Sequence, residues 1–174
     1  MAITPATLSR SGTEHSEQAA LFCWAAMAAR HGFELANNMS SYGDKSLAKL
    51  NANVWPELRW MHAIPNGGGR SIIQASQLKA EGVKRGIPDI FLPVSKTLSS
   101  GLYIEMKRAS GVPSDISKEQ TEFAQFAWKE GYHWYVAFGW KQAARLVESY
   151  LLNETPWLAP HQETVQKSVR GYMA

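Results

Sequence analysis

The sequence has a single cysteine, no long apolar run, and no motif of the common zinc hydrolases or phosphate-binding loops. Because Cys23 is the only cysteine among 174 residues, neither a disulfide within the chain nor a structural zinc site with two or more cysteines can form. The longest apolar run, residues 19–29, is too short to cross a bilayer. Residues 1–16 also lack the apolar segment of a signal peptide. We therefore expect a soluble intracellular protein with no membrane partner.

Charge is modest in total but unevenly distributed. The chain has 18 basic and 15 acidic residues, a formal net charge of +3. Residues 70–108 contain seven basic and three acidic residues, a net charge of +4, which leaves −1 for the rest. A basic stretch that encloses isolated carboxylates suits a polyanionic partner together with a cation. An ordinary solvated surface is the alternative interpretation of the same pattern.

Hydrophobic patterning predicts an α/β fold with a mixed sheet and flanking helices. Thr13 can cap a helix over residues 14–31, and the capping box of Ser117 and Gln120 begins a later helix. Further helices are expected at 71–81 and 140–152, and strands at 59–65, 87–94, 102–108 and 132–138. The turn at 96–101 predicts that the second and third strands are antiparallel neighbours. Residues 34–57 are expected to be irregular, with a short helix around 45–50.

The informative feature is Asp89 at the start of one strand and Glu105-Met106-Lys107 on the next. Alternation along a strand places Glu105 and Lys107 on one face of the sheet, with Tyr103, and sends the apolar residues between them into a core. Adjacent strands can bring Asp89 close to Glu105. Two neighbouring carboxylates repel each other unless a divalent cation lies between them, and oxygen ligands favour Mg²⁺ or Mn²⁺. A lysine beside them can orient water or stabilise charge on a phosphate.

This arrangement resembles the PD-(D/E)xK nuclease superfamily and, within it, the stand-alone form of the VRR-NUC domain family. The family's eponymous tripeptide stands here as Val83-Lys84-Arg85. The matching stretches are Glu14-His15-Ser16-Glu17-Gln18, Ile64-Pro65-Asn66-Gly67-Gly68, Gly82-Val83-Lys84-Arg85-Gly86-Ile87-Pro88-Asp89, Leu102-Tyr103-Ile104-Glu105-Met106-Lys107 and Ser117-Lys118-Glu119-Gln120. The resemblance implies a restriction-endonuclease-like core in residues 13–152, with an N-terminal tail at 1–12 and a C-terminal extension at 153–174.

The resemblance also implies roles for particular residues. Asp89 and Glu105 would be the principal metal ligands, joined by the backbone carbonyl of Met106, and Lys107 would be the catalytic lysine. The first-helix acid would be Glu14, bound directly or through water.

Three further positions carry alternatives or supporting roles. Glu17 is the rival of Glu14 for the first-helix acid, and Glu14 is preferred because it lies four residues before Gln18, which would support the metal shell. Gln120 would face the site from its helix, although the capping box explains the same residue. Phosphate contacts are expected from Asn66, Arg70, Lys84, Arg85 and Arg108.

Stand-alone members of the family imply a metal-dependent endonuclease that cuts branched DNA, such as four-way (Holliday) junctions, as a homodimer. A two-fold dimer suits a substrate that needs two symmetric nicks. Two alternatives remain at this stage: a flap-directed or restriction-like nuclease that uses the same site, and a DNA-binding module without turnover. We expect the protein in the cytoplasm, that of a bacterial or phage-infected cell.

Overall fold

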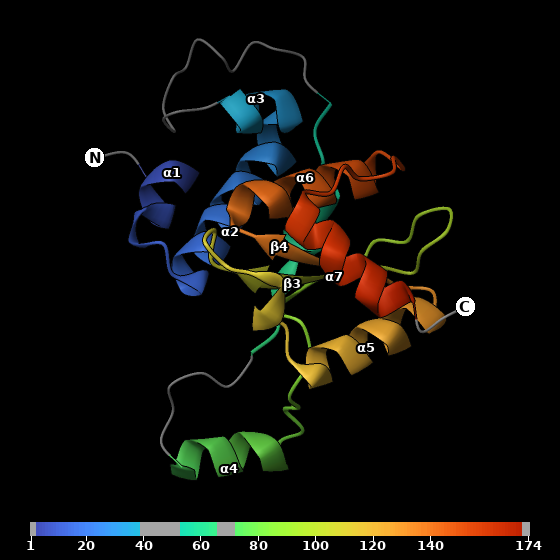
Figure 1. Cartoon of the computed structure of the whole chain (residues 1–174). Coiled ribbons are helices and arrows are strands. Elements are labelled where there is room, and N and C mark those ends of the chain that lie inside the picture. The colour runs from blue at the N-terminus through green and yellow to red at the C-terminus, as the bar shows by residue number, and fades with distance from the viewer. Residues whose placement is uncertain (1–2, 39–52, 66–71, 172–174) are drawn as a thin grey trace.

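The computed structural model describes residues 3–38, 53–65 and 72–171 of the chain (Figure 1). A four-stranded sheet has the order β1-β2-β3-β4. Its strands are β1 (His62–Ala63), β2 (Ile90–Leu92), β3 (Leu102–Lys107) and β4 (His133–Phe138). The first two pairings are antiparallel and the β3–β4 pairing is parallel. The predicted mixed sheet with flanking helices is confirmed, as is the antiparallel pairing across the turn at 96–101.

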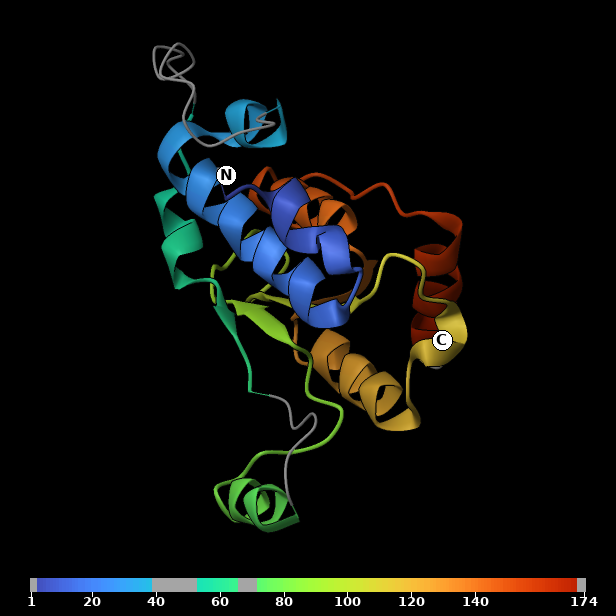
Figure 2. The ribbon, with the colours of Figure 1, turned by 90° about the vertical axis from the view of Figure 1, so that its left-hand side faces the viewer.

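Helices cover both faces of the sheet (Figures 1 and 2). Helices α2 (Glu14–His31) and α6 (Trp140–Leu151) enclose the larger core on one face. Helices α5 (Lys118–Lys129) and α7 (Pro160–Arg170) enclose a smaller core on the other. Strand β3 supplies Leu102, Ile104 and Met106 to the larger core, as its alternation predicted.

Helix α2 illustrates how closely local sequence sets an element's bounds. Thr13 accepts a hydrogen bond from the Ser16 N–H at 3.2 Å, and the Ser16 hydroxyl accepts one from the Thr13 N–H at 3.0 Å. This reciprocal cap satisfies two N–H groups at the start of the helix. Gly32 follows the last residue with φ +83°, a conformation that ends the helix. The predicted helix over 14–31 is confirmed residue for residue.

Two predicted strands are much shorter than expected, because proline acts at their ends. Residues Pro56–Trp60 form the 3-10 helix η3, with Pro56 at its first position, so the predicted strand at 59–65 contracts to β1. Pro88 and Pro93 flank β2, and a proline has no N–H to donate to a neighbouring strand. The predicted strand at 87–94 therefore pairs only at Ile90–Leu92.

Several helices lie where the sequence predicted irregular chain. Helix α3 (Phe33–Asn38) follows Gly32, and helix α1 (Pro5–Leu8) with the 3-10 helix η1 (Ser9–Ser11) lies within the expected N-terminal tail. A further 3-10 turn, η4 (Pro113–Asp115), precedes α5. Helix α7, within the expected C-terminal extension, begins at Pro160, because proline is favoured at the first position of a helix. The short helix expected around 45–50 lies outside the described residues.

Helix α7 lies along β4, the strand at one edge of the sheet. Gln162 donates a hydrogen bond through Nε2 to the Val136 carbonyl at 2.8 Å, and Gln166 donates one to the Trp134 carbonyl at 3.0 Å. These glutamines are buried, and they satisfy carbonyls that a fifth strand would otherwise pair. Valine side chains of the same helix contribute to the smaller core.

Helix α4 (Ile72–Ala80) stands apart from this body, below the sheet in both views (Figures 1 and 2). Its predicted bounds of 71–81 are confirmed to within one residue. None of the described helices is long and apolar enough to cross a membrane.

Candidate active site

The start of β2 lies beside the last residues of β3 through a specific antiparallel register. Ile90 pairs with Ile104, so the next position places Asp89 opposite Glu105. The Asp89 carboxylate accepts a hydrogen bond through Oδ2 from the Met106 N–H at 2.9 Å. The Asp89 carbonyl accepts another from the Ile64 N–H at 2.7 Å, which connects the start of β2 to the residue after β1. The predicted approach of Asp89 to Glu105 follows from this pairing.

Glu105 is almost completely buried, with 2% of its surface exposed. Its Oε1 accepts hydrogen bonds from Lys107 Nζ at 2.8 Å and from Gln120 Nε2 at 2.5 Å. Its Oε2 is buried and has no partner among the described residues. An ionised carboxylate oxygen without a partner is costly in a protein interior, so this atom marks a place where a cation would be stabilised.

The pKa of Glu105 follows from this burial. Desolvation, followed by the charge of Asp89, raises the pKa of the carboxyl to about 8, despite the nearby ammonium of Lys107. Burial by itself lowers the pKa of Lys107, but Glu105, and then Glu14 and Asp89, more than offset this and leave the pKa raised. The surrounding carboxylates therefore favour the cationic form of Lys107, and a further positive charge beside Glu105 would lower the raised pKa of its carboxyl.

Glu14 and Glu17 lie on the first turn of α2 but have different surroundings. The Glu14 carboxylate lies 3.9 Å from Lys107 Nζ, and its side chain is 55% exposed. The Glu17 side chain is buried, and its Oε2 accepts a hydrogen bond from the Trp140 N–H at 2.9 Å. The geometry therefore places Glu14 with the candidate site and Glu17 against the start of α6. Sequence reasoning did not identify this contact; the one available signal is that Gly139, before α6, has no side chain to cap it.

Gln120 makes contacts that fit both of the alternatives left open by the sequence. Its Oε1 accepts a hydrogen bond from the Ser117 N–H at 2.8 Å, which completes the capping box of α5. Its Nε2 donates to Glu105. Gln18 is half-buried on α2, and among the described residues its side chain makes no hydrogen bond to the site.

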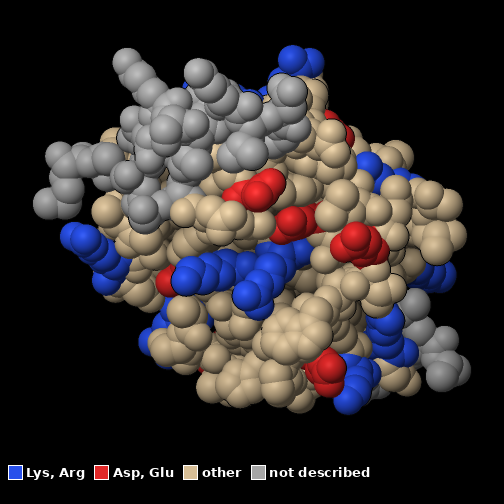
Figure 3. Space-filling model, turned by 90° about the horizontal axis from the view of Figure 1, so that it is seen from above, with Lys and Arg blue, Asp and Glu red and all other residues tan. Residues whose placement is uncertain are grey.

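The expected phosphate-binding residues are placed only in part. Lys84 and Arg85 are exposed on the segment between α4 and β2, and Arg108 is exposed directly after Lys107. Gly86 allows this segment to lie close against α5. A Cβ at this position would lie only 2.5 Å from the Glu119 carbonyl oxygen. Asn66 and Arg70 lie outside the described residues. The face seen from above carries acidic and basic side chains side by side, so basic charge does not dominate there (Figure 3).

The carboxylates do not form a complete metal centre as they stand. In the described ranges, no three His, Cys, Asp or Glu side chains lie close enough together to hold a metal ion. The donors present nevertheless fit a hard divalent cation, since Asp89, Glu105 and Glu14 offer carboxylate oxygens around one lysine and one of these oxygens is buried without a partner.

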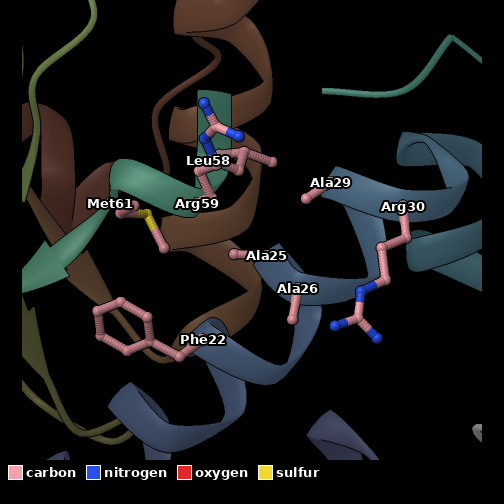
Figure 4. Close-up of a pocket in the computed structure, with 8 residues that line it drawn as sticks. All are labelled: Phe22, Ala25, Ala26, Ala29, Arg30, Leu58, Arg59 and Met61. Atoms are coloured by element: carbon pink, nitrogen blue, oxygen red, sulfur yellow. The ribbon is translucent and has the colours of Figure 1, made fainter. Parts of the chain in front are cut away.

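A separate cavity of about 260 Å³ lies between α2 and η3 (Figure 4). Its lining is mostly apolar, with two arginines: Phe22, Ala25, Ala26, Ala29, Arg30, Leu58, Arg59 and Met61. None of the predicted site residues lines it, so this cavity is distinct from the carboxylate–lysine cluster.

Comparisons with known proteins support the fold. No model of a protein family and no curated protein matches the sequence. A solved structure described as a VRR_NUC domain protein matches with a TM-score of 0.53 and 22% identity, over 80% of this chain and 88% of that chain. The resemblance that the motifs predicted is thus confirmed at the level of structure: the chain has the α/β fold of a VRR_NUC domain protein.

Proposed function

We propose that the protein is a divalent-metal-dependent nuclease that hydrolyses phosphodiester bonds in DNA. The observation that carries the proposal is the meeting of Asp89, Glu105 and Lys107 at adjoining strand ends, with a buried carboxylate oxygen that lacks a partner. A scaffold has no need to bury an acid and a lysine on a face where apolar residues would pack. The VRR_NUC fold and the matching motifs of the sequence support the same reaction class.

The metal would be held by Asp89, Glu105 and Glu14, with the Met106 carbonyl as a further oxygen donor. Mg²⁺ or Mn²⁺ held there would lower the pKa of a water molecule and offset negative charge on a phosphate. Lys107 is already held by Glu105 at 2.8 Å, so its ammonium group is fixed near the reacting phosphate, where it orients the attacking water. Gln120, on α5, restrains the Glu105 carboxylate by a hydrogen bond. No nucleophilic serine or cysteine is needed for this hydrolysis.

Branched DNA is the proposed substrate, and a homodimer the proposed active form. One chain of 19.4 kDa offers little surface for a large junction, whereas two copies supply two active sites with matched symmetry. Trp157, with 67% of its surface exposed, supplies apolar contact area for such a pairing. Light scattering at micromolar concentration should give about twice the chain mass, and a monomer would refute the dimer without affecting the nuclease assignment.

The direct test is cleavage of radiolabelled four-way junction, flap, single-stranded and linear duplex DNA, each with Mg²⁺, with Mn²⁺ and with chelator. The proposal expects metal-dependent cutting with the four-way junction preferred. Preferential cutting of the flap would identify the flap-directed alternative, and sequence-dependent cutting of duplex a restriction-like one. Binding without cutting under every condition would identify a DNA-binding module.

A further inference from the structure

Glu17 connects two helices that are far apart in the sequence. Its carboxylate, on α2, is buried with 5% of the residue exposed. Oε2 accepts a hydrogen bond from the N–H of Trp140, the first residue of α6, at 2.9 Å. A buried carboxylate is retained only where its hydrogen bonds or charge interactions offset the loss of water. The contact therefore calls for a reason beyond packing.

The start of α6 explains why an acceptor is needed at this place. The first N–H groups of a helix have no partner within the helix, and a side chain at the capping position normally accepts one of them. Gly139 occupies that position with φ +86° and has no side chain to do so. Glu17, which lies on α2, accepts this hydrogen bond in place of a capping side chain. Its negative charge lies at the positive end of the α6 dipole.

The same junction reaches the candidate catalytic lysine. The Gly139 N–H donates to the carbonyl of Lys107 at 2.9 Å. A Cβ at Gly139 would lie 3.1 Å from the Ala109 Cβ, a tight contact, and the φ of +86° is one that residues with a side chain rarely adopt, so glycine is favoured here. Glu17, Trp140, Gly139 and Lys107 thus form a continuous connection between the first turn of α2 and the end of β3.

Glu14 depends on that connection for its position. It precedes Glu17 by three residues, and residues at this spacing lie on the same side of a helix. Its carboxylate is 3.9 Å from Lys107 Nζ, at the limit of an ion pair, and more than half of its side chain is exposed. Packing of its own side chain therefore does little to hold Glu14 at the site, whereas the buried Glu17 one turn later anchors the backbone that carries it.

We propose that Glu17 is a positioning residue: its bond to the Trp140 N–H holds the first turn of α2 where Glu14 reaches the metal beside Lys107 and Glu105. The inference rests on the proposed function and adds to it a residue that touches neither the metal nor the DNA. It also separates the roles of the two glutamates, since Glu14 acts through its charge and Glu17 through an acceptor oxygen.

The distinguishing experiment compares E17Q with E17A. Glutamine retains an oxygen that can accept the Trp140 N–H but loses the negative charge, and alanine loses both. Cleavage and Mn²⁺ binding, the latter followed by electron paramagnetic resonance, should remain near wild type in E17Q. In E17A the metal concentration for half-maximal cleavage should rise about 10- to 100-fold, as for other residues that orient metal ligands. The KM for DNA should stay unchanged. The matched variant E14Q, which removes a ligand charge, should be impaired about as severely as E14A.

A second pair of variants tests the donor side and does not require E17A to fold. W140P removes the N–H, and proline is accepted at the first position of a helix. W140A keeps the N–H, so it sets the baseline for loss of the indole ring. W140P should raise the metal requirement above that of W140A, in the same range as E17A.

The outcomes separate this inference from the proposed function. Equal impairment of E17Q and E17A would show that the charge of Glu17 acts directly and would overturn the positioning role. The positioning role would also be overturned if E17A had the metal requirement of wild type and W140P had that of W140A. Wild-type protein that binds Mn²⁺ without cutting any DNA would end the proposed function but leave the metal-binding comparison valid. Wild-type protein that binds no Mn²⁺ would refute both.

Discussion

Both faces of β3 are largely buried, but they differ in chemistry. Leu102, Ile104 and Met106 point into the larger core, and each is almost fully buried among apolar neighbours. On the opposite face Glu105 and Lys107 are almost as buried, yet they are an acid and a base. Desolvating charges costs free energy that even an ion pair often fails to recover. The comparison teaches that burial alone does not distinguish the structural face from the candidate functional one, whereas the burial of ionisable groups does.

The largest effect is expected from removing a single proposed metal ligand. D89A or E105A should reduce cleavage below detection, because each removes a carboxylate from the proposed metal site. DNA binding should persist, since Lys84, Arg85 and Arg108 are exposed and are expected to contact phosphates rather than the metal. Cleavage assays and fluorescence anisotropy with labelled junction DNA measure the two separately. Cleavage within about tenfold of wild type in either variant would contradict the metal-site assignment, since the loss of an essential group costs far more.

A smaller loss of activity is expected from substitutions of the two glutamates in the first turn of α2. E14A should lose far more activity than E17A, because Glu14 is proposed to bind the metal while Glu17 only holds the helix. Rates at saturating Mg²⁺ provide the comparison, and thermal unfolding confirms that both variants fold. If the two variants exchanged places, the assignment of Glu14 as the first-helix metal ligand would be wrong although the reaction class would stand.

The structural face should respond in the opposite way. I104A removes a fully buried side chain from the larger core and should lower the free energy of unfolding by about 2–5 kcal/mol. The rate per folded molecule should stay close to wild type, because Ile104 points away from Glu105. Denaturant unfolding and cleavage below the melting transition test both parts. A large loss of rate in folded I104A would show that the two faces are coupled.

The mildest perturbation is pH. Unfolded chains lose the Glu105 proton near pH 4.5, whereas the folded, metal-free protein retains it up to a pKa of about 8. The folded state therefore binds more protons in this window, and its stability should fall as pH rises from about 4.5 to about 8 and then level off. E105Q should remove this contribution to the slope. Denaturant titrations in chelator give the measurement, and an identical slope in wild type and E105Q would contradict it.

Part of this site could be predicted from the sequence because it depends on local patterns. The alternation of β3 and the turn at 96–101 sufficed to bring Asp89 opposite Glu105. The capping box of α2 fixed its first residue and hence the position of Glu14. Strand ends were less predictable, since Pro88 and Pro93 shorten β2 without changing its type.

The remaining features depend on contacts between distant segments. The acceptor role of Glu17 needs a partner 123 residues away in the sequence. The burial of Glu105 needs β4 and α5 to cover it, and alternation alone says only which face it occupies. The start of α7 could not be predicted, because Pro160 is compatible with either the end of a helical pattern or a helix start, and only packing on β4 decides between them.

Helix α7 has a consequence for how copies of this protein can associate. An edge strand with unpaired carbonyls is a template onto which another chain can add a strand. Gln162 and Gln166 occupy two such carbonyls of β4, so strand addition there would first have to displace the helix. The opposite edge of the sheet is the two-residue strand β1, which offers little length for pairing. Association through a continuous intermolecular sheet is thus disfavoured at both edges, and a chain ending at residue 152 would regain that hazard at β4.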